Sequence, residues 1–372
     1  MGSRRDLSDR GLESLVISRA PLLVSFGVVG PTPKTQRRLT NQVVSLAIDY
    51  HVYTIIAPNR SEGMRMICGG QDVLSSFVTA SEPVPGDAMA LPHAISKHFD
   101  VRDGLSVFLA PPVAPGLGLG MLGSLAVTMI KGLSYFFGID MEPKDVVELA
   151  CHIGTRDLGY PAHSHYQYAA AYGGISSSSV RANRISYAPL QVSAVTHQAL
   201  EQGLMLFCTG GPQVAWPHSV SEPVAGPAGR TAVRHLEVFH SLASKLSTAL
   251  GDGDLERFGD LLHRLWLTRA RLDGRSGDSP VDLAYEVARK HGALGGHGRS
   301  GDDAAYLVFY CPKANQAAVE EALLPMGWQR WPLMLTGTGV QVFDMMSWQP
   351  QGLSSDASWR RFSIPEGVAP PR

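Results

Sequence analysis

The chain has 372 residues, of which 44% are apolar and 17% charged, and its 32 Lys and Arg nearly balance its 33 Asp and Glu. This length predicts two domains, and so high an apolar content with so little net charge excludes disorder over most of the chain. The charge balance also argues against nucleic acid or a membrane as a partner, because both require a strongly cationic surface. We therefore expect a small-molecule partner.

The cysteines lie far apart in the sequence, without a CxxC pair; they are Cys68, Cys151, Cys208 and Cys311. This spacing favours free thiols in a reducing, cytoplasmic compartment over a disulfide framework or a zinc site. Residues 1–14 are polar and lack the apolar core of a signal peptide, so we expect a disordered N-terminus. Residues 104–139 carry a single charge, but prolines and glycines interrupt them, which predicts a buried helix rather than a membrane span.

The first half of the chain alternates between strand-like and helix-like patterns. Strand-like runs lie at residues 15–30, at 41–57 (two runs) and at 105–110. Helical patterns follow at residues 121–138 and 143–152, and a Ser-rich stretch at 175–190 leads into a further strand region.

The second half begins with a loop-like stretch at residues 217–232 and then becomes mainly helical. Leucines and phenylalanines recur at helical spacing from Arg234 to Leu265, with Gly251 as the expected break. Further helices are predicted at 281–291 and 314–325, and strands at 304–311 and 339–343. Mixed strands and helices in two blocks predict an α+β protein with a boundary near residue 190.

Three segments in this order resemble the GHMP kinase superfamily, and within it the heptose 7-phosphate kinase-like branch of sugar kinases. They are SRAPLLVSF at 18–26, PGLGLGMLGSLAV at 115–127 and YAAAYGGI at 168–175. The helical stretch 254–266, together with residues 281–296 and 306–312, also lies where this family has counterparts. The resemblance implies a domain like ribosomal protein S5 domain 2 over residues 15–190 and a ferredoxin-like C-terminal domain over 191–347. The ligand cleft would lie between the two, and residues 348–372 would form a flexible tail.

The motifs that carry kinase chemistry in this family are altered. Gly116, Gly118 and Gly120 keep the pattern of a phosphate-binding loop, but Met121 and Leu122 replace serines that help to hold magnesium. Neither side chain can ligate a hard cation, which requires oxygen.

The other two altered positions concern the catalytic base and the third glycine-rich run. The aspartate of the family's QDQY motif falls on Tyr166, and HGRSGDDAAY at 297–306 places Asp302 and Asp303 where backbone should close on a triphosphate. Like charges in that place would repel a nucleotide. We therefore expect no ATP-dependent phosphoryl transfer and no cofactor; ATP and magnesium would be needed only if the chain is a divergent kinase.

The replacing residues suggest other chemistry. His297 with Asp302 or Asp303 could form an orienting pair, in which the carboxylate would raise the pKa of the imidazole, and His163, His165 and Tyr166 could supply the opposing acid or base. The alternative is that all of these are solvated loop residues. His163 and His165 could also be a metal pair if they alternate on a strand, although no third ligand is apparent.

The candidate substrate contacts share polar side chains or flexible backbone near the expected cleft; they are Arg19, Thr32, Lys34, Arg299, Gly116, Gly118 and Gly120. The leading hypothesis is a repurposed enzyme that acts on a sugar-, cyclitol- or nucleoside-like metabolite by acid–base chemistry, in specialised metabolism. The alternatives are a non-catalytic ligand-binding pseudokinase and a divergent sugar-phosphate kinase. A homodimer is left open by the sequence.

Overall fold

The computed structural model describes residues 15–27, 40–59, 64–68, 74–77, 89–101, 104–112, 118–160, 164–181, 184–209, 230–275, 277–300 and 305–344. The expected termini at 1–14 and 348–372 and most of the expected loop at 217–232 lie outside these residues. None of the described helices has the length and apolar content that crossing a bilayer requires.

The larger of two sheets has eight strands and is built mainly from the first half of the chain. Its order is β12-β1-β2-β5-β3-β4, with β6 paired to β2 and β7 paired to β6. The strands are β1 (Val16–Phe26), β2 (Asn41–Pro58), β3 (Met64–Cys68), β4 (Leu74–Phe77), β5 (Leu105–Ala110), β6 (Ile175–Arg181), β7 (Arg184–Pro189) and β12 (Gln341–Asp344). The prediction of two runs in 41–57 is wrong, because β2 is one strand of 18 residues. It pairs with β1 along one edge and divides its other edge between β6 and β5.

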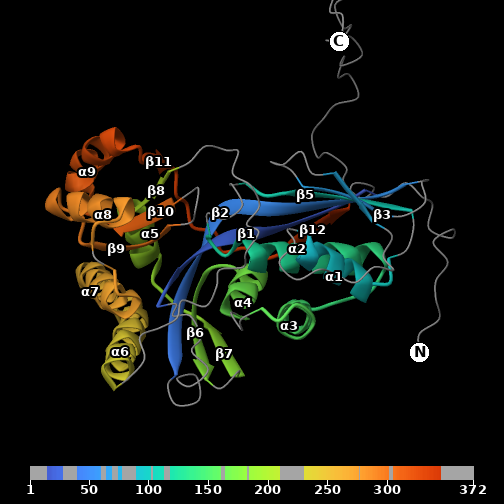
Figure 1. Cartoon of the computed structure of the whole chain (residues 1–372), viewed down its shortest axis with the longest axis horizontal. Coiled ribbons are helices and arrows are strands. Elements are labelled where there is room, and N and C mark those ends of the chain that lie inside the picture. Colours follow the sequence, from blue (N-terminus) through green and yellow to red (C-terminus); the bar gives the residue numbers. More distant parts are fainter. Residues whose placement is uncertain are drawn as a thin grey trace, which may run out of the picture.

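Helices cover one face of this sheet. Figure 1 shows α1 (Ala90–His98), α2 (Met121–Phe136), α3 (Pro143–His152) and α4 (Ser164–Tyr172) on the same side of β1, β2 and β5. The bounds of α3 match the prediction, and Pro143 with a capping box between Glu142 and Asp145 explains its start. A π-helical turn, Ile153–Asp157, continues α3.

The smaller sheet is antiparallel and belongs to the second half of the chain, in the order β11-β8-β10-β9. Its strands are β8 (Leu204–Cys208), β9 (Gly295–Ser300), β10 (Ala305–Tyr310) and β11 (Gln329–Trp331). The expected central position of β10 is confirmed, since β8 and β9 flank it.

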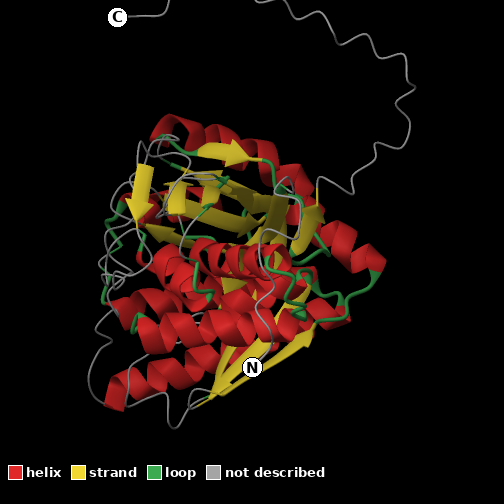
Figure 2. Cartoon of the chain, turned by 90° about the vertical axis from the view of Figure 1, so that its right-hand side faces the viewer, coloured by secondary structure: helices red, strands yellow, loops and turns green. Residues whose placement is uncertain are grey.

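The helices of the second half are α5 (Ala194–Gly203), α6 (Arg230–Asp252), α7 (Leu255–Asp273), α8 (Pro280–Lys290) and α9 (Gln316–Leu323), with 3-10 turns Lys313–Asn315 and Leu324–Met326. The break between α6 and α7 falls at Gly253, whose φ of 76° is left-handed, and not at Gly251. Figure 2 shows the helical layer between the main group of strands and the β6–β7 hairpin.

The chain returns to the first sheet at its end. β12 pairs with β1 in the register Ile17 to Phe343 and Arg19 to Gln341, so the second half of the chain contributes an edge strand to the larger sheet. On the way, the backbone passes the end of α4 so closely that a Cβ on Gly173 would lie 2.4 Å from Thr338 C. The two halves are therefore joined by strand pairing and by backbone packing.

Candidate functional site

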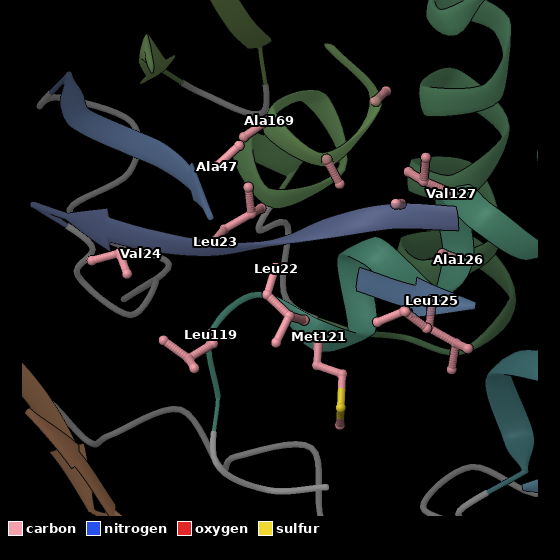
Figure 3. Packing of buried hydrophobic residues seen from close by; sticks show 14 of the residues in the cluster. Leu22, Leu23, Val24, Ala47, Leu119, Met121, Leu125, Ala126, Val127 and Ala169 are labelled. Atoms are coloured by element: carbon pink, nitrogen blue, oxygen red, sulfur yellow. The ribbon is translucent and has the colours of Figure 1, made fainter. Parts of the chain in front are cut away.

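The glycine loop before α2 has a left-handed backbone over Gly118, Leu119 and Gly120, with φ angles of 98°, 50° and 69°. The amide of Leu23 in β1 donates to Leu119 O at 2.8 Å, which fixes the loop against the sheet. Figure 3 shows Leu23 directed toward α4, while Leu119 lies on the loop that enters α2. Gly116 lies outside the described residues. The expected helix-opening glycine loop is therefore present.

The first turn of α2 offers backbone amides but no free hydroxyl. Gly120 is the residue before the helix, and no side chain caps the helix start. Met121 is buried, and the Ser124 hydroxyl donates to Pro21 O at 2.6 Å. The one hydroxyl near this turn is thus used to tie the helix to β1.

Two tyrosine rings pack against the loop. A Cβ on Gly118 would lie 3.3 Å from Tyr306 Cε1 and 3.6 Å from Arg299 Cδ, and one on Gly120 would lie 3.0 Å from Tyr166 Cδ1. The structure therefore brings together Tyr166 from α4, Arg299 from β9 and Tyr306 from β10 at the glycine loop. Tyr306 was not among the candidate site residues, and its position as the last residue of the altered run 297–306 was the one signal in the sequence.

His297 lies at the same place, in β9 opposite Val308 of β10. Its ring centroid is 6.0 Å from that of Phe26 and 6.0 Å from that of Tyr306. Burial, together with the positive charges of Arg269, Arg275 and Arg299, lowers the pKa of His297 to about 3. The imidazole is therefore neutral at physiological pH.

The sequence hypothesis of a raised His297 pKa is wrong. Asp302 and Asp303, the expected orienting partners, lie outside the described residues, and the described charges that act on the ring are cationic. Burial and like charge both disfavour the imidazolium form, so the shift is downward rather than upward.

Two of these arginines are compensated by carboxylates. Arg269 Nε donates to both Asp273 oxygens at 2.8 and 2.7 Å. Arg275 Nη1 donates to Asp282 Oδ1 at 2.8 Å, and its guanidinium lies 4.3 Å from the Trp266 ring centroid. Arg299 is exposed, and its guanidinium is the charge that the site presents to a ligand.

Both tyrosine hydroxyls are protonated at neutral pH. Burial raises the pKa of Tyr166, and Arg299 and Arg269 oppose that shift only in part. Burial also raises the pKa of Tyr306, to which the neighbouring Tyr166 adds. A phenol in this state donates a hydrogen bond and cannot act as the base that a carboxylate supplies.

The histidine pair expected before Tyr166 is not on a strand. His165 is buried in the first turn of α4, with its ring centroid 4.0 Å from that of Tyr166, and His163 lies outside the described residues. Residues two apart on a helix point in different directions, so the argument from strand alternation does not apply. In the described part of the chain, no three His, Cys, Asp or Glu side chains gather as metal ligands would.

Arg19 lies away from the loop. Ser18 faces α2, because its hydroxyl donates to Thr128 O at 2.7 Å, so its neighbour Arg19 points to the opposite face of the sheet. There the Arg19 guanidinium donates to Gln341 Oε1 at 2.9 and 2.7 Å and lies 5.3 Å from the Phe343 ring centroid. The predicted contact of Arg19 with the ligand site is therefore not found, and Thr32 and Lys34 lie outside the described residues.

Comparison with known proteins agrees with this architecture. Residues 88–174, which include the glycine loop, α2 and α4, match the model of the GHMP kinases N terminal domain. This part of the chain is similar to the N-terminal domain of the GHMP kinase superfamily. Within this superfamily it resembles the heptose 7-phosphate kinase-like branch, and the α+β fold is that of the family.

Among curated proteins, the chain is 24% identical over 215 residues to D-glycero-alpha-D-manno-heptose 7-phosphate kinase of Campylobacter jejuni. The match covers 57% of this chain and 62% of that enzyme, so it falls short of two thirds of its length. A putative sugar kinase from Campylobacter jejuni has a similar fold, with a TM-score of 0.70, 18% identity and coverage of 89% of this chain and 98% of that one. A D-glycero-D-manno-heptose 1-phosphate kinase from Bacteroides thetaiotaomicron also reaches a TM-score of 0.70, at 19% identity and 88% and 98% coverage.

Proposed function

We propose that this chain binds and converts a small polar metabolite of sugar, cyclitol or nucleoside type at the glycine loop, without phosphoryl transfer from ATP. The observation that carries the proposal is Tyr166, which stands where the family's catalytic carboxylate is expected. Its ring packs on Gly120 and its pKa is raised by burial. A protonated phenol held in this position cannot deprotonate a hydroxyl that attacks a phosphate.

The remaining groups suit hydrogen-bond donation to an oxygen-rich ligand. Tyr166 and Tyr306 supply phenolic hydroxyls, and Arg299 can bind an anionic group or stabilise charge that develops on a substrate oxygen. His297 is neutral and therefore takes part through hydrogen bonds rather than by giving up a proton. In acid–base chemistry at this site, a tyrosine hydroxyl beside Arg299 would act as the acid.

Two other functions remain in competition with this one. A divergent ATP-dependent sugar-phosphate kinase is favoured by the names of the relatives, which are heptose phosphate kinases. A non-catalytic ligand-binding pseudokinase is favoured by the loss of the base and of the serines at Met121 and Leu122. All three functions would use the glycine-loop site, so measurements of activity and of nucleotide binding distinguish them.

The first test concerns nucleotide. We expect no Mg–ATP binding in isothermal titration at millimolar ATP, and no phosphate transfer from ATP to heptose 7-phosphate or heptose 1-phosphate. Tyr166→Asp, which restores a carboxylate, should not create such activity, because Met121 and Leu122 still provide no oxygen ligand for magnesium. A dissociation constant below about 100 µM, or transfer by the unmodified chain, would establish the kinase instead.

The second test uses ligand-induced thermal shifts with a panel of sugars, cyclitols, nucleosides and their phosphates. Tyr166→Phe and Arg299→Met should reduce the shift given by the best ligand, whereas Tyr172→Phe on the exposed side of the same helix should not. If the ligand binds and mass spectrometry finds it chemically unchanged after incubation, the result would favour the pseudokinase. Unchanged binding in both site variants would place the ligand elsewhere and refute the proposal.

A further inference from the structure

An apolar row crosses the larger sheet on the face opposite to the helices. The strand registers pair Phe343 with Ile17, Ile17 with Ile55, Ile55 with Phe108, and Phe108 with Ile67. Adjacent strands β12, β1, β2, β5 and β3 thus each place one apolar residue side by side. We call these residues the outer row.

The outer row points away from the core. In β1, β2, β5 and β3 its neighbours along the strand are buried, for example Ser18, Ile56, Val107 and Met66. Phe343 and Phe108 are each 37% exposed and Ile67 is 40% exposed, and the two residues between the phenylalanines are half-buried. Figure 1 shows the described helices α1 to α4 on the other side of these strands.

Few charges interrupt this face. On one side of the outer row, Arg19 is bound to Gln341 and stacks on Phe343. On the other side, Ser106 accepts from Asn59 Nδ2 at 2.9 Å, and Arg65 is exposed near the end of the row. A sheet face of this composition that no described helix covers is typical of surfaces that bind another protein.

The size of the face fits a second copy of the same chain. At about 4.8 Å per strand and about 7 Å between successive residues on one face, the outer row with its two flanking rows covers about 24 by 20 Å, or about 500 Å². Two copies would bury about 1,000 Å² in total, which is the lower size limit of a specific interface. The row is also self-complementary, because Ile55 lies at its middle and bulky apolar residues lie at both ends.

We propose that this chain forms a homodimer in which the outer rows of two copies pack face to face across a two-fold axis near Ile55. Sheets packed in this way lie about 10 Å apart with interdigitated side chains. The interface does not rest on the proposed function, since it lies on the face of the sheet turned away from α2 and α4. Ligand binding at the glycine loop is therefore expected to continue when the dimer is broken.

The first experiment measures mass in solution by analytical ultracentrifugation over a range of concentrations. We expect a dimer that dissociates at least tenfold more readily in Phe108→Glu and in Ile67→Glu. The control is Leu283→Glu, on α8 and 49% exposed, which should leave the dimer unchanged. Circular dichroism melting curves check that each variant is folded, and thermal shift with the best ligand checks that the glycine-loop site is intact.

A second experiment locates the axis. Ile55→Cys should be linked into a covalent dimer by a short bifunctional thiol reagent that spans the roughly 10 Å between the facing sheets, whereas Leu283→Cys and the unmodified chain should not. A monomeric wild-type chain, or a dimer unaffected by Phe108→Glu and Ile67→Glu, would overturn the proposal. A chain ending at Asp344 that dimerises when the full chain does not would also overturn it, because residues 345–372 would then be the natural cover of this face.

Discussion

At the scale of single residues, His297 shows how the surroundings of a side chain determine its protonation state. Among the described residues, the structure places this candidate catalytic histidine beside Tyr306 and Arg299 at the glycine loop. Desolvation favours the neutral ring, and the cations of α7 and its end add to this preference. The same residue in an open loop would titrate near its ordinary value.

This burial predicts a pH dependence of stability. The pKa of His297 is 6.5 in the unfolded chain and about 3 when folded. Below pH 6.5 the unfolded state binds more protons, so the free energy of unfolding falls as the pH is lowered toward 3. His297→Phe, which keeps a ring beside Phe26, should reduce the loss between pH 7 and pH 4 by about 1–2 kcal/mol.

Denaturant unfolding at several pH values measures this effect. Some loss will remain in His297→Phe, because burial also lowers the pKa of His240, to about 4. The exposed His152→Gln should follow the wild-type profile. If His297→Phe also follows it, the ring of His297 is not desolvated in the folded chain.

The sequence predicts part of this site and misses the rest for physical reasons. Gly118, Gly120, Tyr166 and Arg299 converge as the family resemblance implies, since conserved strand and helix order fixes their backbone positions. The cations around His297 could not be foreseen, because they come from α7 and its end. Arg19 was misplaced because strand alternation turns it away when Ser18 bonds to α2.

At the scale of secondary structure, the site depends on how closely α2 and α4 approach. A Cβ on Gly123 in α2 would lie 2.7 Å from Tyr166 Cβ and 3.1 Å from Tyr166 C. Only a glycine allows this distance, because the nearest atoms belong to the Cβ and the backbone of Tyr166, which cannot move as the end of a flexible side chain can.

Gly123→Ala should therefore destabilise the chain by about 1–3 kcal/mol, since an added methyl group would collide with backbone that cannot easily move. Gly251→Ala is the matched control, because Gly251 is also helical and nothing lies within 4 Å of an added Cβ. There the substitution should stabilise the chain by about 0.5–1 kcal/mol. The melting temperatures of both variants test these opposite expectations. Equal shifts would show that α2 and α4 do not approach each other as closely as the structure has them.

The predicted elements were most accurate where local signals are strong. Pro143 and the acidic capping residues determine the start of α3, whereas nothing local announces that β2 continues through residues 41–58. Its length is imposed by pairing with β1, β5 and β6, which become its neighbours only when the chain folds. Helix α1 escaped prediction because it is short and contains Pro92.

At the scale of the whole molecule, β10 connects two apolar clusters. Tyr306 and Val308 belong to the larger cluster, which extends to β1 and α2, while Leu307 and Phe309 belong to the cluster beneath α8. Because side chains alternate along β10, one face of this strand packs in the larger cluster with β1 and α2, and the other face packs in the cluster beneath α8. Because β10 contributes to both clusters, we expect a disruptive substitution in β10 to destabilise both halves of the molecule together.

Val308→Asp tests that connection. Val308 is fully buried, and its register partners in the neighbouring strands are the apolar Leu206 and His297, whose neutral imidazole supplies no positive charge to balance a carboxylate. Burying an unpaired polar or charged group costs several kcal/mol, which is comparable to the 5–15 kcal/mol by which a whole domain is stable. We expect insoluble protein, or soluble protein without a cooperative melting transition. Leu324→Asp, at a side chain 61% exposed, should melt like the wild type. Soluble Val308→Asp protein with one sharp calorimetric transition would mean that β10 is not the shared centre of the two clusters, and that the glycine-loop site does not depend on it.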